Sequence, residues 1–108
     1  MLNKTTTFKM SSLSIIVLTL LLSSHSYGAN STFEKVCKSC HSGGLKGWIS
    51  GAPNVNKKSD WAEYLQRDSV EDMQKIVING SADHKVKGDC DSCTEGQIIE
   101  AIDYMMHL

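Results

Sequence analysis

The stretch that decides the fold is "VCKSCHSGG", Val36 to Gly44, which holds Cys37, Cys40 and His41 in the pattern Cys-x-x-Cys-His. Two cysteines spaced by three residues lie on one face of a helical turn. Both thiols therefore reach the two vinyl groups of one haem, and the histidine that follows projects its imidazole under the iron. The pattern is typical of covalent c-type haem attachment. The alternative is a structural disulfide between Cys37 and Cys40, with His41 incidental.

The N-terminal segment has the composition of a secretory signal peptide. Two lysines precede "LSIIVLTLLL", an apolar stretch of ten residues over 13–22, and small residues near Gly28 offer a cleavage site. Ten residues are too few to cross a bilayer, which needs about 20, although an uncleaved anchor is the alternative. We therefore predict a signal peptide over 1–28, one domain over 29–108, a periplasmic location and no stable membrane insertion after cleavage.

The charge of the mature chain argues against a nucleic-acid partner. Without the two lysines of the signal segment, nine basic residues remain against 12 acidic ones, a net charge of −3. No basic cluster marks a nucleic-acid surface, and we expect electrostatic steering of partners to be weak. A domain this small usually needs a disulfide, a metal or a covalent cofactor for stability, and exported cysteines should be paired or modified.

Apolar periodicity predicts an all-α domain of about four short helices, because no alternating strand pattern stands out. Ser31 or Thr32 is expected to cap the first helix, and Thr94 with Gln97 forms a capping box before the last. The segment 42–59 holds four glycines and the only proline, so it is expected to be a long loop. The expected helices cover residues 31–41, 59–67, 69–80 and 95 onward.

Five stretches of the mature chain carry a resemblance to a known family: "CKSCH" (37–41), "GAPNV" (51–55), "ING" (78–80), "KGDCDSC" (87–93) and "AIDYMM" (101–106). With these stretches the chain resembles the class I c-type cytochromes, and within them the cytochrome c5 group. This resemblance implies a small class I cytochrome c fold around one haem c, attached through Cys37 and Cys40, with His41 as the proximal iron ligand.

The same resemblance implies roles for three more side chains near the haem. The carbonyl of Pro53 would accept the Nδ1–H of His41, a bond that fixes the ring and makes it a stronger ligand. Phe33 would pack against the last helix near Tyr104. Trp61 would lie at the haem edge, either with its N–H toward a haem propionate or as an ordinary core residue.

A second Cys-x-x-Cys, Cys90 to Cys93, is followed by threonine instead of histidine. The resemblance and the oxidising compartment favour a disulfide between the two. A thioredoxin-like redox pair would normally need a βαβ context, which this sequence lacks. A zinc site formed with His84 and His107 is a third interpretation.

The sixth iron ligand is where the chain departs from the c5 group, in which a methionine precedes Pro-Pro-Lys-Gly. Matching Lys87-Gly88 to that Lys-Gly places His84 at the methionine position. We therefore expect the iron to be held by His41 and His84. In the alternative, His84 is a solvated surface residue. The competing ligands are then Met73, Met105, Met106, His107, Lys85 and Lys87.

These features together predict a periplasmic monohaem cytochrome that carries single electrons between redox proteins. Imidazole in place of methionine should lower the haem potential. With both axial positions filled no substrate site remains, so we do not expect an enzyme. Redox partners would dock transiently at the haem edge, near residues 37–51. The alternatives are a haem-based gas or redox sensor with a weak or absent sixth ligand, and a thiol–disulfide protein that uses Cys90 and Cys93.

Overall fold

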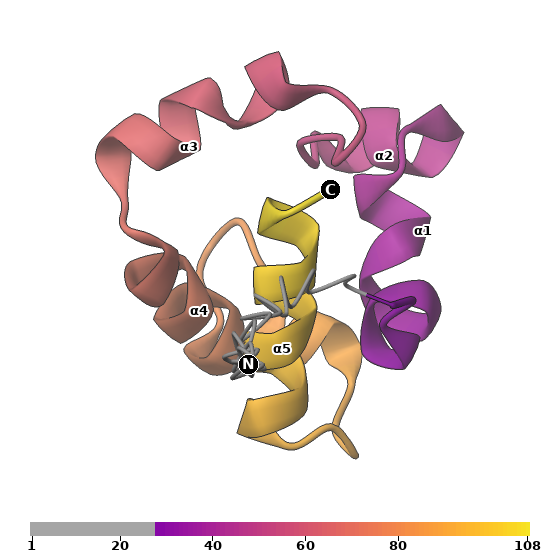
Figure 1. The fold of residues 1–108 in the computed structure, drawn as a ribbon, viewed down its shortest axis with the longest axis vertical. Coiled ribbons are helices and arrows are strands. Elements are labelled where there is room, and N and C mark those ends of the chain that lie inside the picture. Colours follow the sequence, from indigo (N-terminus) through magenta and orange to yellow (C-terminus); the bar gives the residue numbers. More distant parts are fainter. Residues whose placement is uncertain (1–27) are drawn as a thin grey trace, which may run out of the picture.

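Short helices joined by tight turns make up the whole described part of the chain, residues 28–108 of a computed structural model (Figure 1). No strand occurs within this range, so the all-α prediction is confirmed. The predicted signal peptide lies outside the described residues, apart from Gly28. None of the helices in this part of the chain has the length and apolar character to cross a bilayer.

Within the described residues, the first element is a π-helical turn and the last is the longest helix. In order, the elements are η1 (Phe33–Cys37), α1 (Lys38–His41), α2 (Gly44–Ser50), η2 (Lys58–Trp61), α3 (Ala62–Arg67), α4 (Val70–Asn79), η3 (Val86–Asp89) and α5 (Glu95–Met106).

The two longest helices both begin at a side-chain cap, and the cap of α5 is the one expected from sequence. Before α4, the side chain of Ser69 accepts a hydrogen bond from the backbone N–H of Asp72 at 3.1 Å. Before α5, Thr94 and Gln97 form the reciprocal capping box. Such caps satisfy N–H groups that have no partner inside the helix.

The first helical segment is capped differently from the prediction. Asn30 accepts a hydrogen bond from the backbone N–H of Phe33 through its side-chain oxygen at 2.8 Å, and Thr32 makes no capping bond. The expectation of Ser31 or Thr32 was therefore wrong. Asparagine is as good a cap as serine, and here it lies one residue earlier than the residues considered.

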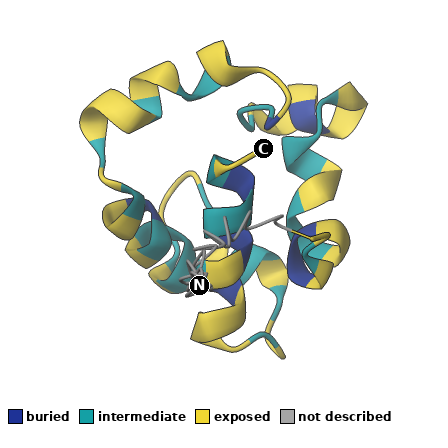
Figure 2. Cartoon of the chain, viewed as in Figure 1, coloured by how far each residue is buried: buried dark blue, intermediate teal, exposed yellow. Residues whose placement is uncertain are grey.

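Helix α5 is the centre of the core. Figure 1 shows it between α1 and α4, and it contacts both η1 and α4. Phe33 of η1 packs against it, with its ring 5.2 Å from that of Tyr104 and tilted by 54°. Figure 2 shows buried residues gathered on α5 while α2 and α3 are largely exposed. The core cluster consists of Phe33, Val55, Ala101 and Met105.

The segment 42–59 is not the long loop that its glycines suggested, because α2 occupies Gly44–Ser50. The helix is closed at its C-terminus by Gly51 in the left-handed conformation, with φ 68°. Leu45, Trp48 and Ile49 have the spacing of one helical face, but this face is exposed. A glycine-rich helix without a buried apolar stripe gives the sequence signature of a loop.

Candidate functional site

The two thiols of the first motif lie one helical turn apart, Cys37 at the end of η1 and Cys40 in α1. Within the described residues both are unpaired, so the alternative disulfide between them is not formed. Cys37 packs against the core cluster, and burial, helped by the nearby Cys40, raises the pKa of its thiol to about 11. The structure thus presents two free thiols at the spacing that thioether attachment needs.

His41 is held by the hydrogen bond that the family resemblance implied. Its Nδ1–H donates to the carbonyl of Pro53 across 2.9 Å. Burial lowers the pKa of His41; the bond to Pro53 opposes this effect, and the nearby His84 adds to it. The ring is therefore neutral at pH 7, which is the form that binds a metal, and Nε2 is the nitrogen left for it.

The structure brings His84 to His41 although 42 residues separate them in sequence. The two ring centroids are 6.3 Å apart and the ring planes differ by 21°. Nδ1 of His84 donates to the carbonyl of Lys85 at 2.7 Å, which again leaves Nε2. A tight turn fixes the backbone: the N–H of His84 donates to the hydroxyl of Ser81 and its carbonyl accepts from the N–H of Ser81.

A left-handed turn follows His84 along the chain. Lys87, Gly88 and Asp89 have φ of 50°, 60° and 66°. A Cβ on Gly88 would lie 3.0 Å from the side chain of Val36, so this turn is packed tightly on η1. The turn thereby ties the His84 segment to the helix that carries the thiols, a role that the sequence analysis missed.

Trp61 lies beside the histidine. Its ring is 5.7 Å from that of His41, with 26° between the planes. Its Nε1–H donates to the carbonyl of Asn54 at 3.0 Å, which agrees with the alternative of an ordinary core residue. The bond fixes the segment that carries Pro53, and Trp61 also packs against the core cluster.

Cys90 and Cys93 are joined by a disulfide in the structure. Their sulfurs are therefore not thiolates that could bind zinc, and no group of three or more metal-ligating side chains is found in residues 28–108. The zinc interpretation is accordingly wrong. The bridge lies between η3 and α5, and the carbonyl of Cys93 accepts from the ammonium of Lys87 at 3.1 Å.

The competing iron ligands are engaged elsewhere. Met73 and Met105 are buried in the core, and Met106 packs against the core cluster. Lys85 pairs with Asp89 at 2.6 Å, and Lys87 binds the carbonyl of Cys93. Nδ1 of His107 lies 2.6 Å from the carbonyl of Asp103, one turn earlier.

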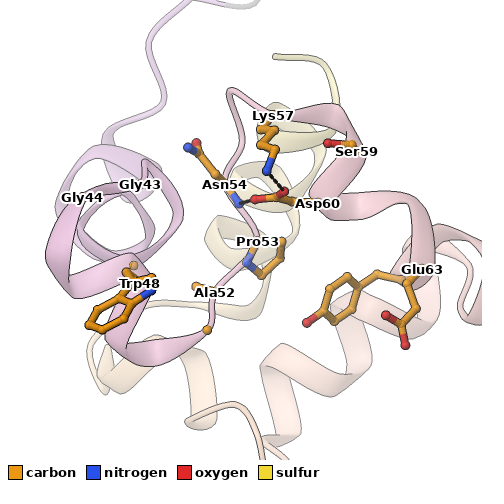
Figure 3. Close-up of a pocket in the computed structure, with 13 residues that line it drawn as sticks. Gly43, Gly44, Trp48, Ala52, Pro53, Asn54, Lys57, Ser59, Asp60 and Glu63 are labelled. Carbon is orange, nitrogen blue, oxygen red and sulfur yellow. Dashed lines mark hydrogen bonds and ion pairs between the residues drawn. The ribbon is translucent and has the colours of Figure 1, made fainter.

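An open cleft of about 620 Å³ lies on the outer side of the Pro53 segment, between α2 and η2–α3 (Figure 3). Asp60 pairs with Lys57 at 3.0 Å and accepts the backbone N–H of Asn54 at 3.3 Å. The Lys57 ammonium and that N–H lower the pKa of Asp60. Asp60 and Asn54 thus position Pro53 and, through it, His41. No sequence motif marks either residue for this role.

The donor set fits a covalent haem. Two free thiols lie one turn apart on a helix. The ring of His41, which follows them, lies close to the ring of His84. Each imidazole ring donates its Nδ1–H to a backbone carbonyl. This second bond fixes the orientation of a ligating imidazole and raises its basicity.

Comparisons with known proteins agree with this chemistry. Residues 28–105 match the family model described as "Cytochrome C oxidase, cbb3-type, subunit III". No curated protein and no solved structure gives a significant match. The matched range includes every residue of the site described above.

Proposed function

The chain belongs to the cytochrome c domain family of cbb3-type oxidase subunit III, and on that premise we propose that it is a periplasmic monohaem electron carrier with bis-histidine ligation. Membership means that one haem c is bound covalently through cysteine, and Cys37 and Cys40 are the free cysteines of the described chain. When bound, the haem supplies one-electron redox chemistry.

The observation that carries the proposal is the relation between His41 and His84. A metal–imidazole bond is about 2.0 Å long, so one metal atom between two Nε2 atoms separates them by about 4 Å. The 6.3 Å between the ring centroids leaves room for a metal atom held by bonds of that length. Both Nδ1 atoms are already bonded to carbonyls. His41 and His84 would therefore hold the iron, each through its Nε2.

A second imidazole ligand changes the reduction potential of the haem. Methionine opposite histidine raises a haem potential, whereas imidazole donates more strongly to ferric iron and lowers it. His84 thus makes the chain a low-potential carrier. With both axial positions filled by protein, no site remains for a substrate, which supports electron transfer over catalysis.

The segment around Cys90 supports a c5-like variant of the fold. The disulfide closes the turn just before α5, and the left-handed residues of η3 pack against Val36. Both hold the His84 loop against the helix that carries the thiols. The apolar stretch over 13–22 supports export, and exported chains keep disulfides.

The test is carbon monoxide binding and redox titration of the haem-loaded protein, with His84→Ala, His84→Met and the control His107→Ala. We expect the wild type and the control to bind carbon monoxide slowly or not at all, and His84→Ala to bind it rapidly. The midpoint potential should rise in His84→Met. A wild type that binds carbon monoxide rapidly would favour a gas sensor, and a wild-type far-red charge-transfer band typical of methionine ligation would exclude bis-histidine ligation.

A further inference from the structure

The net charge of the chain conceals a separation of charge along it. Between Glu34 and Asp60 lie five lysines and no acidic residue. From residue 60 to the end, 11 acidic residues stand against four basic ones. The thiols and His41 all lie in the basic part. The expectation of weak electrostatic steering rests on the net charge, which does not describe this separation.

Helix α2, within the basic part, turns an apolar face to solvent. Leu45, Trp48 and Ile49 are 72%, 80% and 70% exposed, although their spacing is that of one helical face. The opposite side of α2 rests on the haem-attachment segment: a Cβ on Gly47 would lie 2.6 Å from the carbonyl oxygen of Cys40. The apolar face therefore lies one helix away from an attachment cysteine.

Lysines accompany this face. Lys46 lies on α2 itself, and among the described residues it has no ion pair. Lys57 and Trp48 line the same cleft, whose far side carries the carboxylates of Asp60 and Glu63 (Figure 3), and Lys57 pairs only with Asp60. We call Leu45, Lys46, Trp48, Ile49 and Lys57 the α2 surface.

We propose that the α2 surface docks an acidic redox protein, one whose apolar contact patch is rimmed by carboxylates. This inference rests on the proposed electron-carrier function and names the chemistry of the partner. Complementary charge speeds and orients the encounter, and the apolar face holds the short-lived complex. One electron then passes from the partner, which is oxidised, to this protein, which is reduced, or in the reverse direction.

The size and charge of the α2 surface argue against a second copy of the chain. Three exposed apolar side chains offer an area on the order of 400 Å², the scale of the largest patch on a typical monomer. A stable interface needs about 800 Å² from each partner. A symmetric dimer would also place lysine against lysine, because the same surface contributes both sides.

An anionic bilayer fits the surface less well than an acidic protein does. Trp48 and Lys46 are residue types that bind membrane surfaces, but the part of the chain after residue 59 carries a net charge of −7 and would be repelled. A bilayer on α2 would also cover the side nearest Cys40, through which a carrier exchanges electrons.

The test is stopped-flow reduction of the haem-loaded protein by a reduced acidic flavodoxin, with reduced lumiflavin, a small neutral flavin, as the control reductant. The variants are Lys46→Glu and Trp48→Ser. Their matched controls are Lys75→Glu, which makes the same charge change on α4, and Leu65→Ser, which removes another exposed apolar side chain.

We expect the flavodoxin rate constant to fall as ionic strength rises. At low salt Lys46→Glu should lower it by about 3- to 10-fold, Trp48→Ser should lower it as well, and both controls should change it by less than about two-fold. Lumiflavin should reduce all five proteins equally. Failure of lumiflavin to reduce the wild type would instead contradict the proposed function.

Three results would overturn the inference. The first is a rate constant for reduction by flavodoxin that rises with ionic strength. An equal change of this rate constant in Lys46→Glu and Lys75→Glu would count the same way. The second is binding of the protein to vesicles of anionic phospholipid in a cosedimentation assay, if Trp48→Ser abolishes this binding and Lys46→Glu leaves the rate of reduction by flavodoxin unchanged. The third is a dimer in analytical ultracentrifugation that Trp48→Ser dissociates.

Discussion

Replacing Gly47 with alanine should destabilise the protein, although the same change inside a helix normally stabilises it. A Cβ at this position would lie 2.6 Å from the carbonyl oxygen of Cys40 and 3.6 Å from its carbon. The obstacle is backbone and cannot rotate away, so α2 must lift from the attachment segment. Overpacking of this kind costs about 1–3 kcal/mol, against a helix-propensity gain of about 0.5–1 kcal/mol. The expected net loss is about 1–2 kcal/mol.

The matched control is Gly96→Ala in α5, where the nearest atom to the new Cβ would be 3.9 Å away. This variant should gain up to about 1 kcal/mol from propensity alone. Thermal unfolding of both haem-loaded variants gives the comparison, because 1 kcal/mol moves the midpoint by about 4–8 °C in a domain of this size. If Gly47→Ala were as stable as Gly96→Ala, the close packing of α2 against the backbone of Cys40 would be refuted.

The remaining predictions concern a cap, a buried bond and the disulfide. Asn30→Ala should cost about 1 kcal/mol of unfolding free energy in urea, while Ser31→Ala should cost much less. Trp61→Phe should lower stability by about 1 kcal/mol, because the N–H that donates to a backbone carbonyl is lost; an unchanged urea midpoint would contradict that bond. Alkylation of the native protein should find no free thiol at Cys90 or Cys93, and replacing both with serine should cost roughly 2 kcal/mol by loop-closure entropy.

The sequence predicted what local patterns and short-range caps determine. The thiol spacing and the capping box of α5 follow from residues three positions apart, and both are present in the structure. The Pro53 acceptor and the Phe33–Tyr104 contact were reached through the family resemblance instead. The Phe33–Tyr104 contact joins the two ends of the domain, and apolar periodicity alone does not pair one helix with another.

The errors share a different physical origin. Helix α2 buries a glycine rather than an apolar stripe, so its pattern resembled a loop. The first helical segment is capped by Asn30, and the sequence does not specify which of several adjacent capping residues makes the bond. The charge separation was visible in the sequence throughout, but a net charge sums over the chain and discards the order of lysines and carboxylates.

The role of Asp60 at the site could not be predicted from sequence patterns. Its carboxylate holds Lys57 and the backbone of Asn54, next to the proline that binds His41. No motif marks an aspartate that positions a ligand through a backbone N–H. Only the folded geometry links it to the histidine.

The central claim is that His41 and His84 both ligate the iron, and electron paramagnetic resonance of the ferric protein tests it most directly. The wild type and His107→Ala should give a low-spin spectrum, because two imidazoles are strong ligands. His84→Ala should lose that spectrum and become high-spin. A high-spin wild type, or a His84→Ala spectrum identical to the wild type, would contradict bis-histidine ligation.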